Sequence, residues 1–160
     1  MKEIKYKPIG IVHSPFKESA GTPIQPKASK GAEGMVEVFP EYTEGLSDLD
    51  GFSHIILICH FHLSRHAPLK VKPYMDNDFR GVFATRSPAR PNPIGLSVVR
   101  LKRIENNKLY IKDLDIIDGT PLLDIKPYVK EFAADEEIKI GWLQNRIDRL
   151  PDSKDDGRFA

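Results

Sequence analysis

The sequence predicts a mainly β protein, folded as a single antiparallel β-barrel with one or two short helices. Thirteen prolines spread along 160 residues leave little room for long helices, because proline breaks both helix interiors and central strand ladders. Between the prolines lie short runs rich in valine, isoleucine, phenylalanine and tyrosine, and several of them alternate apolar with polar residues. Many short strands joined by regular turns are typical of an antiparallel barrel.

The strands that we expect are short and are separated by turn-forming residues. They cover Ile9–His13, Gly34–Val38, Ser53–Phe61, Gly81–Ala84, Ser97–Glu105, Lys108–Asp115 and Ile138–Trp142. Asn106 and Asn107 lie between two alternating runs. They favour a hairpin turn at that point, because asparagine tolerates a positive φ.

Two stretches have the pattern of short helices, Tyr42–Leu49 and Leu143–Leu150. The second carries apolar residues at positions 143, 147 and 150, which is a helical spacing. We expect residues 1–143 to form the barrel domain and residues 144–160 to form a short C-terminal helix and a tail. The tail, Pro151–Ala160, is rich in aspartate, serine and lysine, and we expect it to fray.

The composition indicates a globular chain with a hydrophobic core of its own. With 40% hydrophobic and 29% charged residues over 160 positions, the chain is long enough for one domain without disulfide or metal support. The longest apolar stretch, 54–61, is too short to cross a membrane, and no signal peptide is visible. The single cysteine, Cys59, has no partner for an internal disulfide. These features predict a cytoplasmic protein without a membrane partner.

Charge is unevenly distributed although the formal net charge is only +1. Basic residues dominate from position 65 to 103, and acidic residues dominate from 113 onward. The basic middle segment has the chemistry to hold nucleic-acid phosphates. It is equally the pattern of strands that expose lysine and arginine on a solvated face, so both interpretations stay open.

The glycines exclude the common nucleotide-binding loops. No two of the eleven glycines are adjacent or two positions apart, so the G-x-G of the dinucleotide fingerprint does not occur. The phosphate loop, the Gly-x-Ser-x-Gly nucleophile elbow, Cys-x-x-Cys and His-Glu-x-x-His are also missing from the sequence.

The segment richest in candidate functional residues is Gly81–Ser97. Its three prolines, Pro88, Pro91 and Pro93, bias the residues that precede them toward extended backbone. The stiffened loop presents the guanidinium groups of Arg86 and Arg90, which suit carboxylate or phosphate ligands. A rigid loop loses little entropy when a ligand binds, so we favour a functional over a purely structural role.

A second candidate segment surrounds a predicted tight turn at Asp118–Gly119. Thr120 is held extended by the proline that follows it. Asp115 and Asp118 bracket the turn, where they can accept hydrogen bonds from a ribose or an amine, act as bases, or simply cap the turn.

A third candidate is the His-x-His of His60 and His62, which share a face if the strand continues through them. This spacing suits a metal, but no acidic residue lies nearby in the sequence, so we favour histidines of the core or of a ligand pocket and expect no metal. Cys59 alternates to the opposite face, and we expect it to be buried and unreactive.

Four blocks of the sequence resemble the TsaA-like family, also called the TrmO family. They are Ile9-Gly-Ile-Val-His-Ser-Pro-Phe16, Phe52-Ser-His54, Phe83-Ala-Thr-Arg-Ser-Pro-Ala-Arg-Pro-Asn-Pro-Ile-Gly95 and Asp115-Ile-Ile-Asp-Gly-Thr-Pro121. The resemblance extends over roughly residues 6–143. It implies an S-adenosylmethionine-dependent tRNA methyltransferase on a β-barrel, acting on adenine N6 of the threonylcarbamoyl-adenosine beside the anticodon.

The resemblance also implies roles for individual residues. Those assigned to S-adenosylmethionine are Gln25, Pro26, Lys27, Phe61, His62, Arg86, Leu96, Leu114 and Asp115. For tRNA we assign Arg90, Asn92 and Thr120, and for the N6 proton we assign Asp118. An adenosine suits backbone groups and an acid, and a methionyl carboxylate suits the Arg86 guanidinium.

The resemblance further implies a homodimer with tRNA as its partner. Two other functions stay open at this point. One is a sensor that binds S-adenosylmethionine or a nucleotide without catalysis. The other is a hydrolase with a metal at His60 and His62.

Overall fold

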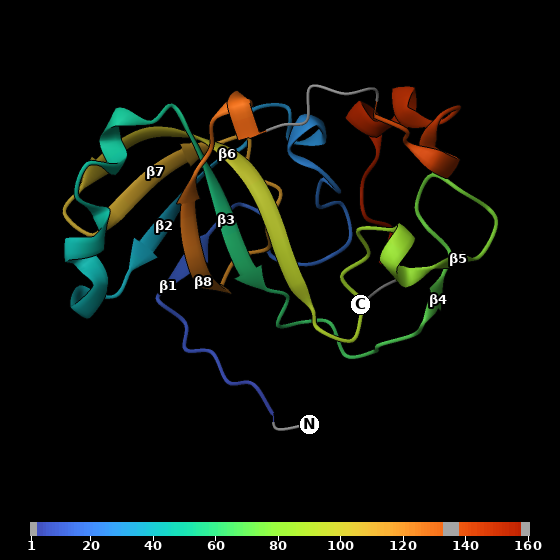
Figure 1. The fold of residues 1–160 in the computed structure, drawn as a ribbon, viewed down its shortest axis with the longest axis horizontal. Helices are drawn as coiled ribbons and strands as arrows, with labels where there is room; N and C mark the ends of the chain where they lie inside the picture. The colour runs from blue at the N-terminus through green and yellow to red at the C-terminus, as the bar shows by residue number, and fades with distance from the viewer. Residues whose placement is uncertain (1–2, 133–137, 158–160) are drawn as a thin grey trace.

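Six antiparallel strands form a closed barrel, as predicted (Figure 1). The computed structural model describes residues 3–132 and 138–157. Around the barrel the strand order is β1-β2-β7-β6-β3-β8. The bounds are β1 Gly10–His13, β2 Glu33–Val38, β3 His54–His60, β6 Ile94–Glu105, β7 Lys108–Lys112 and β8 Thr120–Pro127. The mainly β fold class is therefore confirmed.

Alternate residues of each strand fill the barrel. In β3 the buried positions are Ile55, Leu57 and Cys59, each fully inaccessible, whereas the residues between them are partly exposed. Leu109 of β7 and Leu122 of β8 join the same core. Burial of each large aliphatic side chain contributes roughly 1.5–3 kcal/mol, so the alternation alone fixes which face of each strand points inward.

The hairpin predicted at Asn106 and Asn107 is confirmed. Glu105 of β6 pairs with Lys108 of β7, which leaves those two asparagines as the loop, and Asn106 has a φ of 55°. β7 then ends at Lys112 and not at Asp115 as predicted, because Asp113 adopts a φ of 68° that no strand can contain.

Several predicted strand boundaries are wrong. β6 starts at Ile94, inside the proline-rich segment, and not at Ser97. β8 was not predicted at all, because Pro121 and Pro127 make its sequence resemble a loop. Only the first residue of the predicted strand Gly81–Ala84 is extended: β5 (Arg80–Gly81) pairs with β4 (Lys70–Val71), and η4 (Val82–Ala84) follows. No strand forms at Ile138–Trp142, where the 3-10 turn η6 occupies Gly141–Leu143.

The two expected helices are replaced by short segments of 3-10 helix. η2 (Pro40–Leu46) and η3 (Leu49–Gly51) divide the first of them, because Asp48 between them has a φ of 64°. η7 (Ile147–Asp152) follows η6 in the second. The remaining short turns are η1 (Pro26–Ser29) and η5 (Lys130–Phe132). In the described ranges, no helix is long and apolar enough to span a membrane.

The tail does not fray as expected in the part that the structure describes. Lys154 forms an antiparallel bridge with Pro23. Beside it, the Asp155 N–H donates to the Thr22 carbonyl at 2.8 Å, and the Gly21 N–H donates to the Asp155 carbonyl at 2.7 Å. The tail is therefore attached to the loop that follows β1.

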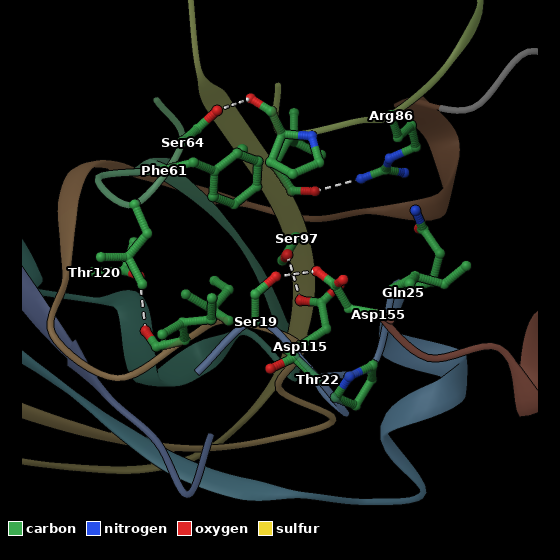
Figure 2. Close-up of a pocket in the computed structure, with 18 of the residues that line it drawn as sticks. Ser19, Thr22, Gln25, Phe61, Ser64, Arg86, Ser97, Asp115, Thr120 and Asp155 are labelled. Atoms are coloured by element: carbon green, nitrogen blue, oxygen red, sulfur yellow. Dashed lines mark hydrogen bonds between the residues drawn. The ribbon is translucent and has the colours of Figure 1, made fainter. Parts of the chain in front are cut away.

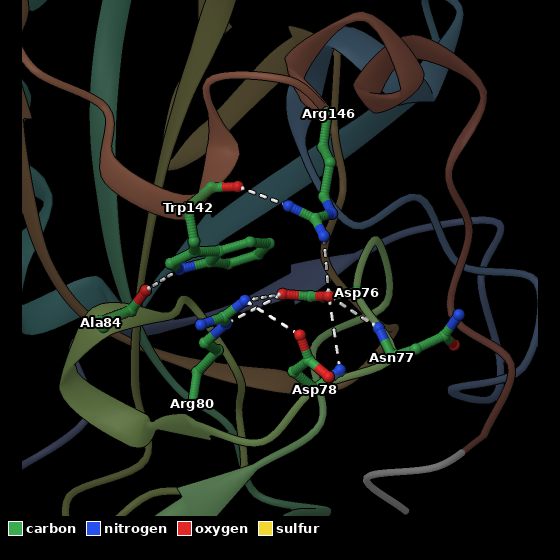
Figure 3. A network of polar contacts seen from close by, with 7 residues as sticks. All are labelled: Asp76, Asn77, Asp78, Arg80, Ala84, Trp142 and Arg146. Carbon is green, nitrogen blue, oxygen red and sulfur yellow. Dashed lines mark hydrogen bonds and ion pairs between the residues drawn. The ribbon is translucent and has the colours of Figure 1, made fainter.

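An ionic network attaches η6 and η7 to the rest of the protein (Figure 3). Asp76, buried beneath them, accepts from the Arg80 side chain at 2.8 Å and lies 3.1 Å from a guanidinium nitrogen of Arg146. Burial opposes ionisation of Asp76, but hydrogen bonds from Arg80 and the backbone, together with the Arg146 charge, lower its pKa. The Trp142 ring lies against Arg80, 5.9 Å from the guanidinium carbon to the ring centroid.

Candidate active site

A cavity of about 320 Å³ opens at one end of the barrel (Figure 2). β1 and β3 end there, and β6 and β8 begin there, so the antiparallel order brings four connecting segments together. The residues that line it are Ser19, Thr22, Pro23, Ile24, Gln25, Phe61, His62, Leu63, Ser64, Tyr74, Arg86, Pro88, Arg90, Ile94, Gly95, Leu96, Ser97, Asp115, Ile116, Ile117, Thr120 and Asp155.

Asp115 is the carboxylate that the barrel wall holds toward this cavity. It follows β7 and accepts a hydrogen bond from the Ser97 hydroxyl of β6 at 2.5 Å (Figure 2). Burial raises its pKa to about 6, although the Ser97 hydrogen bond and the Arg86 charge oppose that rise. The carboxylate is therefore ionised at neutral pH and poorly hydrated, which makes it a strong acceptor for a ligand hydroxyl or amine.

Arg86 supplies the opposite charge on the other side of the cavity. Its guanidinium donates to the carbonyl of Leu96, which fixes the direction of the side chain (Figure 2). Arg90 also lines the cavity, but its guanidinium bends back toward its own loop and lies 3.4 Å from the Thr85 carbonyl oxygen. The two arginines of the proline-rich loop thus have different surroundings, and Arg86 is the one that faces Asp115.

The ring of Phe61 forms an apolar wall of the cavity. The Phe61 N–H donates to the carbonyl of Pro93 at 2.7 Å, which ties the end of β3 to the proline-rich loop. Gly95 leaves the space that the ring occupies, since a Cβ at that position would lie 2.2 Å from the Phe61 Cζ. The glycine of the sequence signature is therefore a packing requirement for the aromatic wall.

Replacing Gly95 with alanine should displace Phe61 and weaken ligand binding in this cavity. Overpacking costs roughly 1–3 kcal/mol, and the Phe61 ring can relieve part of that strain by rotating away from position 95. Isothermal titration calorimetry with S-adenosylmethionine should show an affinity lowered about tenfold, a change of about 1.4 kcal/mol. Gly81→Ala is the matched control, because nothing lies within 4 Å of a Cβ added there. Equal affinities for the two variants would contradict this role of Phe61.

The structure brings most of the predicted binding residues into one cavity. From the set assigned to S-adenosylmethionine, Gln25, Phe61, His62, Arg86, Leu96 and Asp115 line it, and from the tRNA set so do Arg90 and Thr120. The others lie elsewhere. Pro26 and Lys27 start η1, Leu114 is fully buried in the barrel core, and Asn92 is exposed on the loop.

Asp118, predicted to accept the N6 proton, is absent from the cavity lining. Its carboxylate accepts from the Lys17 ammonium at 2.8 Å and from the Ser14 N–H at 2.9 Å. The Lys17 and Ser14 hydrogen bonds lower its pKa. The predicted turn is present, with Gly119 at a φ of 75°, and Asp118 anchors it to the segment after β1. Its catalytic role stays a prediction.

The histidine pair occupies the end of β3 and its exit. His60 is the last residue of the strand, and the exposed His62 follows it on the cavity rim. Partial burial, followed by the charge of His60, lowers the pKa of His62. Among the described residues, no group of three or more His, Cys, Asp or Glu side chains is arranged to hold a metal ion. Cys59 is fully buried, as expected, and burial raises its pKa to about 12.

Sequence reasoning missed one part of the lining. Ser19 and Thr22 lie in the loop after β1, and Asp155 reaches the cavity from the tail. The Ser19 hydroxyl donates to the Asp155 carboxylate (Figure 2). No local sequence pattern predicts a contact between residues so far apart in the chain. The aspartate-rich sequence of the tail is typical of a solvated segment.

The fold and cavity define a small antiparallel β-barrel protein with a binding site for a ligand that carries both polar and apolar parts. Residues 11–134 match the family described as the tRNA-methyltransferase O N-terminal domain. The chain belongs to this family of S-adenosylmethionine-dependent tRNA methyltransferases, as the resemblance predicted.

Similar proteins come from archaea, bacteria and mammals. A "Probable S-adenosyl-L-methionine-binding protein" of Pyrococcus abyssi is 60% identical over 98% of this chain and 85% of its own. The mouse "tRNA (adenine(37)-N6)-methyltransferase" is 36% identical over 84% of this chain and 33% of its own. The crystal structure of TrmO from Pseudomonas aeruginosa superposes with a TM-score of 0.73 at 37% identity, covering 88% of this chain and 63% of that one. The chain thus spans about a third of the mouse protein and under two thirds of the bacterial one.

Proposed function

We propose that this protein methylates N6 of the threonylcarbamoyl-adenosine beside the anticodon of tRNA, with S-adenosylmethionine as methyl donor. One observation supports this proposal most strongly. The buried Asp115 carboxyl, whose pKa burial raises, and the oriented Arg86 guanidinium lie on opposite sides of a cavity that is also lined by the apolar side chains of Phe61 and Leu96. Such an arrangement matches a ligand with hydroxyl groups, an α-carboxylate and an apolar ring.

The residues of the cavity fit S-adenosylmethionine in their chemistry. Asp115 can accept hydrogen bonds from hydroxyl or amine groups, and Arg86 offers donors to a carboxylate. Phe61 and Leu96 can cover the apolar surface of an adenine. When bound, S-adenosylmethionine supplies an electrophilic methyl group on a sulfonium.

What this chain contributes to the reaction is chiefly orientation. Fixing two reactants in line converts a bimolecular step into an effectively unimolecular one. As the new bond to N6 forms and the bond from methyl to sulfur breaks, the N6 proton must also leave. The threonylcarbamoyl group makes that proton more acidic than it is in plain adenine, so a weak base or water suffices. Asp118→Asn tests the one residue that we assigned to this step, and unchanged turnover would remove it from that role.

The test uses labelled S-adenosylmethionine with two tRNAs, one carrying the threonylcarbamoyl group and one lacking it. We expect label on the modified adenosine of the first tRNA only, found by nucleoside mass spectrometry and unaffected by a chelator. Label transfer that stops when the chelator is added would show that the reaction needs a metal ion, contrary to our expectation. Binding of S-adenosylmethionine without transfer to either tRNA would support the sensor; the names of the archaeal relatives describe binding of S-adenosylmethionine and no more.

Two further parts of the proposal concern assembly and location. We propose a homodimer, because one chain of near-neutral charge offers only a local basic surface to tRNA. Analytical ultracentrifugation with and without tRNA tests it, and a monomer in both would overturn it. We also propose a cytoplasmic location, where tRNA is the available substrate.

A further inference from the structure

A second cavity, of about 480 Å³, lies directly beside the first. Both cavities are lined by Ile24, Gln25, Tyr74 and Arg86. These residues form a common wall, so ligands in the two cavities would be neighbours. The rest of the second cavity is lined by Pro73, Met75, Phe83, Ala84, Thr85, Ser87, Trp142, Leu143, Ile147 and Leu150.

Two aromatic side chains give the second cavity its character. Phe83, in η4, is 77% exposed, although it follows a fully packed valine. Trp142, in η6, is half-buried, and its indole N–H donates to the Ala84 carbonyl at 2.8 Å (Figure 3). This hydrogen bond joins the two aromatic segments, so both belong to one surface. A large exposed aromatic beside a hydrogen-bonded one is typical of a binding surface.

Ion pairs and hydrogen bonds fix the wall of the second cavity that carries Trp142. Arg146, on the segment that carries Trp142, donates to the Trp142 carbonyl at 3.0 Å and reaches Asp76 with its other nitrogen (Figure 3). Arg80 contacts the same carboxylate and the Trp142 ring. A wall fixed by ion pairs and hydrogen bonds needs little ordering when a ligand arrives, and this favours affinity.

The lining selects for a flat, largely apolar group. Arg86 is the one charged side chain among the residues that line this cavity, and it is shared with the cofactor cavity. Phosphates therefore have little to bind inside it. A nucleobase fits better, because stacking on aromatic rings requires only a π-face. Enzymes that modify a base hold it out of the helix or loop in such a pocket.

We infer that the second cavity takes the purine base of the nucleotide that is methylated, stacked on Phe83. This inference rests on the proposed function, because it identifies the first cavity as the site of the methyl donor. The base then enters from the side of η4 and η6, and it meets the donor at the wall formed by Gln25 and Arg86. Phe83 acts as the stacking platform, and Trp142 forms another part of the lining.

The single tryptophan of the chain makes this inference directly measurable. Trp142 lines the second cavity and is absent from the lining of the first. The probe is an anticodon stem-loop RNA carrying threonylcarbamoyl-adenosine, added to the full chain with saturating S-adenosylhomocysteine. We expect it to quench Trp142 fluorescence. The same RNA with an abasic site at that nucleotide should leave the fluorescence unchanged.

A matched pair of variants separates stacking from general RNA binding. Phe83→Ala should weaken binding of the base-containing RNA about tenfold, whereas Phe83→Tyr, which keeps the ring, should restore it. Phe79→Ala is the control, because Phe79 is also 70% exposed but lines neither cavity. None of these variants should change the affinity for S-adenosylmethionine, as calorimetry can verify.

Failure of this inference differs from failure of the proposed function. If the protein transfers methyl to tRNA but quenching is the same with the abasic RNA, or Phe83→Ala binds like Phe79→Ala, the second cavity does not hold the base. If base-dependent quenching is seen without methyl transfer, the result supports the base pocket and contradicts the methyltransferase function. Neither transfer nor quenching would overturn both.

Discussion

Asp115→Asn should make the protein without ligand more stable at neutral pH and at the same time abolish its affinity for S-adenosylmethionine. Burial raises the pKa of Asp115 from 3.8 to about 6, so ionisation of this carboxylate opposes folding. The asparagine oxygen can still accept the Ser97 hydrogen bond, so packing is kept. The variant loses the negative charge that the ligand requires. This is the stability cost that binding sites commonly carry.

The direction in which the pKa of Asp115 is shifted decides how its contribution to the free energy of unfolding changes with pH. Because the folded pKa lies above the unfolded one, the folded protein binds the extra proton between pH 4 and 6. The native state therefore loses stability as pH rises through that window, by as much as about 3 kcal/mol above it. The free energies of unfolding of wild type and variant should coincide near pH 4 and diverge toward pH 7. Urea denaturation at several pH values measures this, and curves that stay parallel would contradict it.

Asp118→Asn is the matched control. It makes the same substitution at a carboxyl group whose neighbours lower its pKa, whereas burial raises the pKa of Asp115. The Lys17 and Ser14 hydrogen bonds lower the pKa of Asp118. Its contribution to stability is present above its unfolded pKa and is lost as pH falls through the lower folded value. Asp118→Asn should therefore destabilise the protein at neutral pH and leave cofactor affinity unchanged.

Arg86→Ala should lower the affinity for S-adenosylmethionine by about 10- to 100-fold. Hydrogen bonds to a charged group contribute roughly 1.5–3 kcal/mol, and the Arg86 guanidinium is held in the cavity by its bond to the Leu96 carbonyl. Arg86→Lys should recover only part of the loss, since lysine lacks the planar fork. Isothermal titration calorimetry measures the affinity directly.

Arg90→Ala provides the comparison, because Arg90 comes from the same loop but bends toward the Thr85 carbonyl. It should keep cofactor affinity and reduce turnover with tRNA, as expected of a residue that contacts the acceptor. If Arg86→Ala bound S-adenosylmethionine as wild type does, the assignment of Arg86 to the carboxylate would be wrong.

The barrel was predictable because its signal is local. Alternation of buried and exposed residues predicts β3 and β7, and the two asparagines mark the hairpin between β6 and β7. β8 was missed because Pro121 and Pro127, at either end of the strand, are residues that normally exclude one. The 3-10 turns were taken for helices because they share apolar spacing with them, while single residues such as Asp48 end them.

The candidate site was likewise predictable only where its residues lie in segments with a local sequence signal. Arg86 and Asp115 lie in segments whose stiff or turn-rich sequences indicated a function, and the structure places both in the cavity. Asp118 was chosen from the same turn, but its partner Lys17 lies about a hundred positions away along the chain. The contribution of Asp155 depends on the pairing of residues 154–155 with residues 21–23, and such long-range contacts leave no periodic trace in a sequence.

That pairing also sets an order of events during synthesis. The barrel strands all precede residue 128, so they can pair while the ribosome is still adding the last part of the chain. The cavity wall at Thr22 waits until Asp155 has emerged to bond with it. A chain released before that point would carry a folded barrel with an incomplete binding site. The part of the cavity that Asp155 lines is therefore completed only after the barrel strands have left the ribosome.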